Sequence, residues 1–209
     1  MGSQRTISKY NLDYYRPDMV SGDYDMPIIY PTIYKPQRLI GFNRVNVADT
    51  SSGIHFYLDD YQFERFWKRP EYYVEKLKPF DCVLTPDFSL YRDMPIAMMV
   101  WNIYRSRLLG QMMQRAGLTV IPTVSWADKR SFDFCFDGLL KHSTLSVSTI
   151  GIKRSQSAYN LWQRGLLKMI TRLRPRQLLV YGGEVEFVYP SDIDVIYYEN
   201  DNVKRLRSL

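Results

Sequence analysis

Four short apolar runs, each followed by polar residues and then by a segment of helical length, constrain this chain more than any other feature. The runs cover residues 53–58, 82–85, 119–124 and 178–181. Runs of Val, Ile and Leu without polar alternation are typical of parallel strands that are buried on both faces. Parallel neighbours need a crossover, which the helical segments supply. The pattern predicts an α/β fold with a mainly parallel sheet.

The number of alternating segments narrows the architecture further. Strand and helix patterns alternate over residues 38–199, with six or seven strands. The clearest helices are predicted between a cap at Asp93 and Gly117, and over residues 155–173. Polar residues at so many strand ends favour a small or incomplete (β/α) barrel, and an open doubly wound sheet is the alternative. A length of 209 residues indicates a single α/β domain, assigned to residues 38–209.

Residues 1–37 differ from the rest because prolines recur among Ile and Tyr. Pro27, Pro31 and Pro36 argue against a helix or a central strand in this segment. The sequence therefore predicts an extended N-terminal arm over residues 1–37. Its apolar part, residues 28–33, is expected to lie on the body or to reach a second subunit, which would give a homodimer through the arm.

Charge and composition limit the partners and the compartment. Lys and Arg outnumber Asp and Glu by 28 to 22, and this mild excess suits a nucleotide or nucleic acid. The basic tail at 204–207 is expected to be a solvated end. No stretch approaches 18 consecutive apolar residues and no secretion signal is present, so we expect a cytoplasmic protein without membrane contact. Cys82 and Cys135 lack a Cys/His cluster, which argues against a disulfide scaffold or a structural zinc site.

Carboxylates follow several of the predicted strands and are the first candidates for chemistry. Converging carboxylates can hold Mg²⁺ or Mn²⁺, which would orient a phosphate and activate water. The predicted metal ligands, also candidate catalytic residues, are Asp59, Asp60 and Asp87. The structural alternative is that Asp59 or Asp60, like Asp93, caps the helix that follows it. Two further carboxylates at strand ends are Glu184, a candidate catalytic residue, and Glu199.

Asp87 carries the most specific expectation. It leaves a buried strand through Pro86, which fixes the backbone and ends the ladder of hydrogen bonds. We expect Asp87 at the carboxyl end of the sheet, partly accessible, and within about 10 Å of Asp59 or Asp60 on the adjacent strand.

His55 is one of two histidines and lies within a predicted strand. Strand alternation places it on the same face as Tyr57 and Asp59, and an imidazole beside a carboxylate is a common proton-transfer pair. His55 is therefore a candidate catalytic residue. The alternative is a packed, hydrogen-bonded structural histidine.

Candidate substrate contacts come from one helix and one strand end. Arg105 and Arg107 on the long helix, with Arg92 near its start, are predicted to meet an anion because guanidinium pairs bidentately with phosphate. Ser125 and Trp126 follow a strand, where the indole ring offers a flat face to a base or a sugar.

Four stretches of the chain resemble a known family. They are residues 53–64 (GIHFYLDDYQFE), 81–91 (DCVLTPDFSLY), 101–107 (WNIYRSR) and 122–126 (PTVSW). The family is an uncharacterised one carried by bacteria, phages and other mobile elements, domain of unknown function 4417, and the likeness covers about residues 35–185. The resemblance transfers no activity or site residue. It implies a cytosolic accessory protein of phage or mobile-element type, for which handling nucleic acid or opposing host defence are common tasks.

Three functions are consistent with these features. The leading hypothesis is binding of a nucleotide or nucleic-acid phosphate at the carboxyl ends of the strands, with metal-assisted phosphodiester hydrolysis by the strand-end carboxylates. The second is a non-catalytic protein that binds a host or phage protein through its Tyr-rich arm and surface. This hypothesis predicts that no cleft is larger than a few water molecules. The third is a glycosidase-like hydrolase, which needs two carboxylates about 5–10 Å apart across an aromatic cleft.

Overall fold

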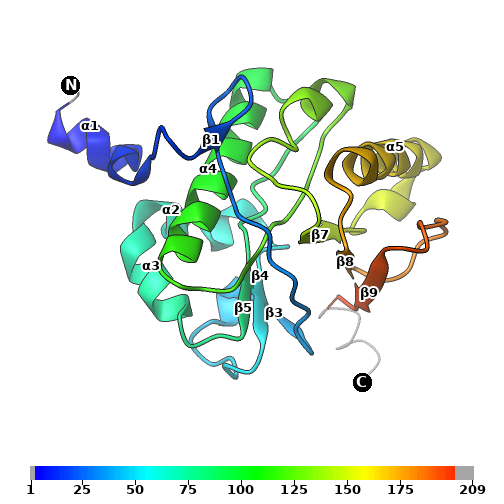
Figure 1. Cartoon of the computed structure of the whole chain (residues 1–209), viewed down its shortest axis with the longest axis horizontal. Helices are drawn as coiled ribbons and strands as arrows, with labels where there is room; N and C mark the ends of the chain where they lie inside the picture. Colours follow the sequence, from blue (N-terminus) through cyan, green and yellow to red (C-terminus); the bar gives the residue numbers. More distant parts are fainter. Residues whose placement is uncertain (1–2, 201–209) are drawn as a thin grey trace.

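Parallel strands form the centre of the molecule in the computed structural model, which describes residues 3–200 (Figure 1). A four-stranded sheet has the order β3 (Leu39–Gly41), β4 (Gly53–His55), β5 (Cys82–Leu84) and β6 (Val120–Ile121). A three-stranded sheet has the order β7 (Thr144–Ser148), β8 (Gln177–Tyr181) and β9 (Asp194–Tyr198). Every pair within the two sheets is parallel, so the predicted α/β fold with a mainly parallel sheet is confirmed.

The two sheets are joined between β6 and β7. Thr123 and Ser146 form an isolated parallel bridge, and the Val124 N–H donates to the Ser146 carbonyl at 2.8 Å. The strands therefore follow one another in chain order across both sheets. At the other edge, the Tyr198 hydroxyl donates to the Pro36 carbonyl at 2.6 Å. No strand pairing joins β9 to β3 within residues 3–200, so the described strands do not close into a barrel.

Helices form crossovers in both sheets, after β4, β5 and β7 (Figure 1). The crossover after β4 contains α2 (Glu64–Lys68) and α3 (Pro70–Leu77), and α4 (Ile96–Arg115) follows β5. The long helix α5 (Gln156–Leu173) follows β7, with the Ser155 hydroxyl accepting from the Ala158 N–H as its cap. Pro95, and not Asp93, occupies the N-cap position of α4, while Gly117 after its end has the expected positive φ of 88°.

Short 3₁₀ helices occupy most of the remaining connections. Their bounds are η1 (Leu12–Tyr14), η2 (Phe42–Arg44), η3 (Asp60–Gln62), η4 (Lys129–Asp133) and η5 (Ile152–Arg154). Several of them begin just beyond a strand, so their side chains lie near the carboxyl ends of the strands.

The strands bury side chains on both faces, which explains the continuous apolar runs. Ile54, Val83 and Val180 belong to the cluster that packs under the helices. Alternate side chains point to the opposite face. There, a second cluster draws on both sheets and contains Leu39, Tyr57, Cys82, Leu84, Ile121, Leu179, Tyr181 and Tyr198. The inner faces of the two sheets therefore share one core, and Cys82 and Cys135 are buried free thiols.

The N-terminal segment is only partly extended. It contains a six-residue helix, α1 (Gln4–Lys9), and a hairpin of β1 (Val20–Ser21) with β2 (Met26–Pro27). The helix departs from the expectation of an extended arm because no proline precedes Pro17. From residue 28 onward the backbone is extended on the body, where Ile29 is buried and its N–H donates to the Gly138 carbonyl at 2.8 Å.

Neither long helix, nor any other within residues 3–200, has the length and apolar character needed to cross a bilayer. The basic tail at 204–207 lies outside the described residues.

Arg107 on α4 is completely buried and holds three segments together. Its guanidinium donates to the carbonyls of Cys135 at 2.8 Å, Asp137 at 3.0 Å and Thr123 at 3.3 Å. Burial lowers the pKa of Arg107 to about 10, so the group stays charged at neutral pH. Arg107 is therefore a structural residue and not the anion ligand that its helix position suggested.

Replacing Arg107 should destabilise the fold strongly. Arg107→Leu removes three hydrogen bonds and leaves buried carbonyl oxygens without donors, and we expect a loss of at least about 3 kcal/mol. Urea unfolding followed by circular dichroism measures it. Arg115→Leu, on the exposed last turn of the same helix, is the matched control and should change stability by less than about 0.5 kcal/mol. Equal effects of the two substitutions would contradict this account.

Candidate functional site

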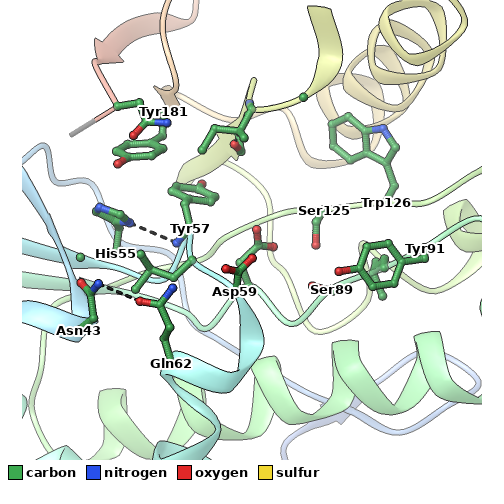
Figure 2. Close-up of a pocket in the computed structure, with 18 of the residues that line it drawn as sticks. Asn43, His55, Tyr57, Asp59, Gln62, Ser89, Tyr91, Ser125, Trp126 and Tyr181 are labelled. Carbon is green, nitrogen blue, oxygen red and sulfur yellow. Dashed lines mark hydrogen bonds between the residues drawn. The ribbon is translucent and has the colours of Figure 1, made fainter. Parts of the chain in front are cut away.

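The carboxyl ends of the strands in both sheets open into one cleft of about 650 Å³ (Figure 2). Parallel strands bring their carboxyl ends to the same edge, where the loops that follow them provide the lining. The side chains that line the cleft are Asn43, Arg44, His55, Tyr57, Leu58, Asp59, Gln62, Asp87, Ser89, Leu90, Tyr91, Ser125, Trp126, Ser148, Ile150, Arg154, Tyr181 and Asn200.

Asp87 is the most perturbed carboxyl group of the cleft. The residue is partly accessible, but its Oδ1 is enclosed and has no hydrogen-bond partner. Burial raises the pKa of Asp87, a hydrogen bond from Ser125 lowers it, the charge of Asp60 raises it and the charge of Arg107 lowers it. The net result is a pKa of about 7. At neutral pH both protonation forms are populated, so Asp87 is suited to accept or donate a proton.

Asp59 and Asp60 have different surroundings although they are adjacent. Asp59 lines the cleft, and its side chain makes no capping hydrogen bond to η3. The Asp60 carboxylate accepts from the Ser89 N–H at 3.1 Å and from the Ser89 hydroxyl at 2.8 Å. Asp60 therefore joins the loop after β4 to the loop after β5, and it does not line the cleft.

The predicted three-carboxylate metal site is not assembled. Within residues 3–200, no three His, Cys, Asp or Glu side chains are arranged to hold a metal ion. The Asp60 carboxylate already accepts hydrogen bonds from Ser89, and with a pKa of about 7 Asp87 is only partly ionised at neutral pH. Asp59 is the carboxylate left to hold Mg²⁺ or Mn²⁺. Since Mg²⁺ is commonly held by one or two carboxylates together with substrate phosphates, this donor set fits only when a phosphate is bound.

His55 lies in an uncharged aromatic wall. Its Nδ1 accepts from the Tyr57 N–H at 3.1 Å, and its ring lies 4.3 Å from that of Tyr181 between centroids. Burial alone lowers the pKa of His55 to about 3, whereas a neighbouring carboxylate would raise it. The expected pair of His55 with a carboxylate is therefore not formed. The imidazole is neutral, and its Nε2 carries the proton because Nδ1 is an acceptor.

Tyr57 and Tyr181 complete this wall. Their rings stack with centroids 4.9 Å apart and planes 16° apart, and the Tyr57 hydroxyl pairs with the Ser146 hydroxyl at 2.6 Å. Burial raises the pKa of the Tyr57 phenol, so it stays protonated. Figure 2 shows His55, Tyr57 and Tyr181 on one side of the cleft, with Tyr91 and Trp126 on the other.

Trp126 packs directly on the backbone of α5 at Gly165, which has no side chain. A Cβ atom added at Gly165 would lie 2.2 Å from the indole ring, so the ring occupies space that any other residue at this position would fill. Trp126 also lies 6.4 Å from the Phe136 ring between centroids. Ser125, the preceding residue, contributes its hydroxyl to Asp87. The predicted pair Ser125 and Trp126 therefore lines the cleft.

Two arginines at the cleft were missed by the sequence analysis. Arg44 on η2 and Arg154 on η5 are exposed and line the cleft. Their only sequence signal was that each follows a predicted strand by a few residues. They bring positive charge to an edge that also carries Asp59 and Asp87.

Like Arg107, the other two arginines that were predicted to meet an anion lie outside the cleft. Arg105 is buried, donates to both carboxylate oxygens of Glu64 at 2.9 and 3.0 Å, and lies 3.7 Å over the Phe88 ring. Arg92 is exposed outside the cleft, and its carbonyl accepts from Arg130. The guanidinium of Arg105 is therefore already paired with the Glu64 carboxylate and is not placed to bind a ligand in the cleft.

Glu184 also lies outside the cleft. It is exposed in a shallow depression beside Lys153 and Tyr159, on the segment between β8 and β9. Two glycines with positive φ, Gly182 and Gly183, turn the chain before it. Of the predicted catalytic residues, the structure brings together His55, Asp59 and Asp87.

Comparison with known proteins gives the family. A family model described as "Domain of unknown function (DUF4417)" matches residues 18–199. The chain belongs to this family. The match extends beyond the stretch of about 35–185 expected from the quoted motifs, because the β1–β2 hairpin and β9 are also part of the DUF4417 domain.

Two phage proteins are similar to this DUF4417 chain. It is 43% identical over 166 residues to the "Gene 1 protein" of Mycobacterium phage D29, and 42% identical over 166 residues to the "Gene 1 protein" of Mycobacterium phage L5. Each alignment covers 78% of this chain, and the chain spans 62% of the D29 protein and 72% of the L5 protein. No solved structure matches the chain.

The raised pKa of Asp87 predicts a specific dependence of stability on pH. The folded protein binds this proton up to about pH 7, whereas an unfolded Asp releases it near its ordinary value of 3.8. The contribution of Asp87 to stability therefore falls as pH rises from about 4 to 7, by at most about 4 kcal/mol, and is level above that.

Asp87→Asn should remove this contribution. We expect the difference in unfolding free energy, variant minus wild type, to increase from pH 4.5 to 7.5 when both are measured by urea unfolding. A difference that stays constant over this range would show that Asp87 titrates normally.

Proposed function

We propose that this DUF4417 protein binds a nucleotide or nucleic-acid phosphate ester in the cleft and hydrolyses the phosphodiester bond. The observation that carries the proposal is Asp87, whose enclosed Oδ1 has no hydrogen-bond partner within a cleft of about 650 Å³ and whose pKa is raised by burial. Perturbed titratable groups in the main cleft of a protein are the default candidates for catalysis. The similarity to two phage proteins supports an accessory role of phage type, for which we propose a cytoplasmic location.

Arg44 and Arg154 support a phosphate as the charged part of the ligand. Both residues line the cleft, and a guanidinium group can bind phosphate through two parallel hydrogen bonds. Carboxylates alone would repel a phosphate. The two arginines offset the charge of Asp59, and the protonated form of Asp87 adds no repulsion.

The aromatic walls support a base or sugar as the neutral part. Neutral His55 and the stacked pair Tyr57 and Tyr181 form one wall, and Tyr91 and Trp126 form the other. Flat ring faces stack on nucleobases without requiring a particular sequence.

The residues of the cleft can carry out the proton transfers of hydrolysis. Ionised Asp87 can take a proton from the attacking water, and protonated Asp87 can donate one to the leaving oxygen. Ser125 orients the carboxyl through its hydrogen bond. Asp59, together with the substrate phosphate, would hold Mg²⁺ or Mn²⁺, which would supply Lewis-acid stabilisation of the developing charge.

We propose an incomplete (β/α) barrel as the finer architecture. The inner cluster shared by both sheets supports it, as does the contact of Tyr198 with the segment before β3. An open doubly wound sheet would place its two faces under separate helix layers, with no shared interior.

The other two functions are less well supported. A protein that only binds other proteins predicted no cleft larger than a few waters, and a cleft of about 650 Å³ weighs against it. A glycosidase is favoured by Asp59 and Asp87 in an aromatic cleft, but it gives no role to Arg44 and Arg154.

Nucleotide binding should depend on the two cleft arginines. Calorimetric titration of the wild type with a nucleoside triphosphate, with and without Mn²⁺, should give saturable binding. Arg44→Gln and Arg154→Gln should each weaken it about tenfold, because each removes a charge-assisted contact of about 1.4 kcal/mol. Lys68→Gln, which removes an exposed cation outside the cleft, is the control. Absence of binding to the wild type would refute the proposal.

Phosphodiester hydrolysis should depend on Asp87. With bis(p-nitrophenyl) phosphate and Mn²⁺, Asp87→Asn should lower kcat about 100-fold or more, since it removes the proton-transfer group but keeps the side-chain shape. Asp18→Asn, which removes an exposed carboxylate outside the cleft, is the control and should keep the activity. Cleavage of a nitrophenyl glycoside in place of the phosphodiester would favour the glycosidase alternative.

A further inference from the structure

We infer that the substrate is a single-stranded nucleic acid whose chain continues from the cleft, past Trp126, into a basic groove between η4 and α5. This inference rests on the proposed function and names its substrate class. The groove has a volume of about 480 Å³. It is lined by Lys129, Phe132, Asp133, Phe136, Lys168, Thr171 and Arg172.

The groove lies along a helix whose own sequence supplies positive charge only. The sequence of α5 contains Arg164, Lys168 and Arg172 and no acidic residue. The three cations are spaced by four residues, so they lie on one face, and all are exposed. At 1.5 Å per residue they form a line of positive charge about 12 Å long.

The opposing carboxylates are too few to neutralise this face. Asp133 is the acidic residue that lines the groove, against Lys129, Lys168 and Arg172. Arg172 pairs with the buried carboxylate of Asp137. Lys129 and Lys168 remain available to phosphates, and counterion release would make such binding dependent on salt.

Trp126 connects the groove to the cleft. Its ring lines the cleft and packs on Gly165, the residue after Arg164. It also contacts Phe136, which stacks with Phe132 at 6.2 Å between centroids and 17° between planes. Trp126 and Phe132, both partly exposed, therefore flank the buried Phe136 ring, and the proposed path of the strand runs over this aromatic cluster from the cleft to the basic face.

Ring faces beside cations favour a single strand over other polyanions. Proteins that bind single strands combine a positive groove with aromatic side chains on which bases stack. The bases of a duplex are paired and stacked on one another, so they cannot reach Trp126 or Phe132. An acidic peptide would use the cations but not the ring faces.

The test compares a short oligonucleotide with its monomer. Fluorescence anisotropy measures binding of a labelled 15-nucleotide oligo(dT), and calorimetry measures binding of dTMP. We expect the oligonucleotide to bind the wild type at least tenfold more tightly than dTMP. The double variant Lys129→Glu with Lys168→Glu should lose at least tenfold in oligonucleotide affinity and have a shallower salt dependence, while dTMP affinity changes less than twofold.

Controls separate the groove from the fold and from the cleft. Arg115→Glu reverses an exposed charge at the far end of α4 and should leave both affinities unchanged. Thermal unfolding of the double variant within about 2 °C of the wild type excludes misfolding as the cause.

Each remaining outcome has one meaning. Binding of dTMP with no tighter binding of the oligonucleotide, or an oligonucleotide affinity that the double variant keeps, would overturn this inference and leave the proposed function standing. Equal affinity for duplex DNA, or full displacement of the oligonucleotide by polyglutamate at equal charge, would overturn the assignment to a single strand. Absence of binding to both ligands would overturn the proposed function itself.

Discussion

The fold and the cleft both depend on the buried guanidinium of Arg107. Its three carbonyl acceptors lie after β6 and in the turn that follows η4, so one side chain fixes these segments relative to α4. The segment after β6 leads directly to Ser125 and Trp126. The same positive charge acts on Asp87 and limits the rise of its pKa. A single buried cation therefore positions one wall of the cleft and adjusts the proton affinity of its main carboxyl.

Local sequence patterns predicted the parts of the structure that local physics determines. Apolar runs such as 82–85 become strands buried on both faces, and the spacing of Leu and Met between residues 155 and 173 becomes α5 with Ser155 as its cap. The direction of the strands then places Asp59 and Asp87 at one edge. These features depend on the hydrophobic periodicity, which can be read from a single sequence, and on the general right-handedness of crossovers between parallel strands.

The roles of individual polar residues could not be predicted in the same way. Asp60 and Asp59 are neighbours, yet a contact with Ser89, 29 residues away in sequence, removes Asp60 from the cleft. Arg105 on α4 is buried against Glu64 and the Phe88 ring, whereas Arg44 on η2 lines the cleft. Such pairings depend on which loops meet in space. The sequence alone therefore located the edge of the sheet at which the cleft lies, but it identified only some of the side chains that line this cleft.

The contact between Trp126 and Gly165 has a mechanical consequence. Because the indole ring rests directly on the backbone of α5, the width of the cleft at Trp126 is set by the position of this helix. A small displacement of α5 must move the ring or open a gap beneath it, since packed interiors do not deform continuously. Binding on the outer face of α5 that shifts the helix would therefore change the cleft through the contact between Gly165 and Trp126. By linkage, a ligand in the cleft would change the binding affinity of that outer face by the same factor.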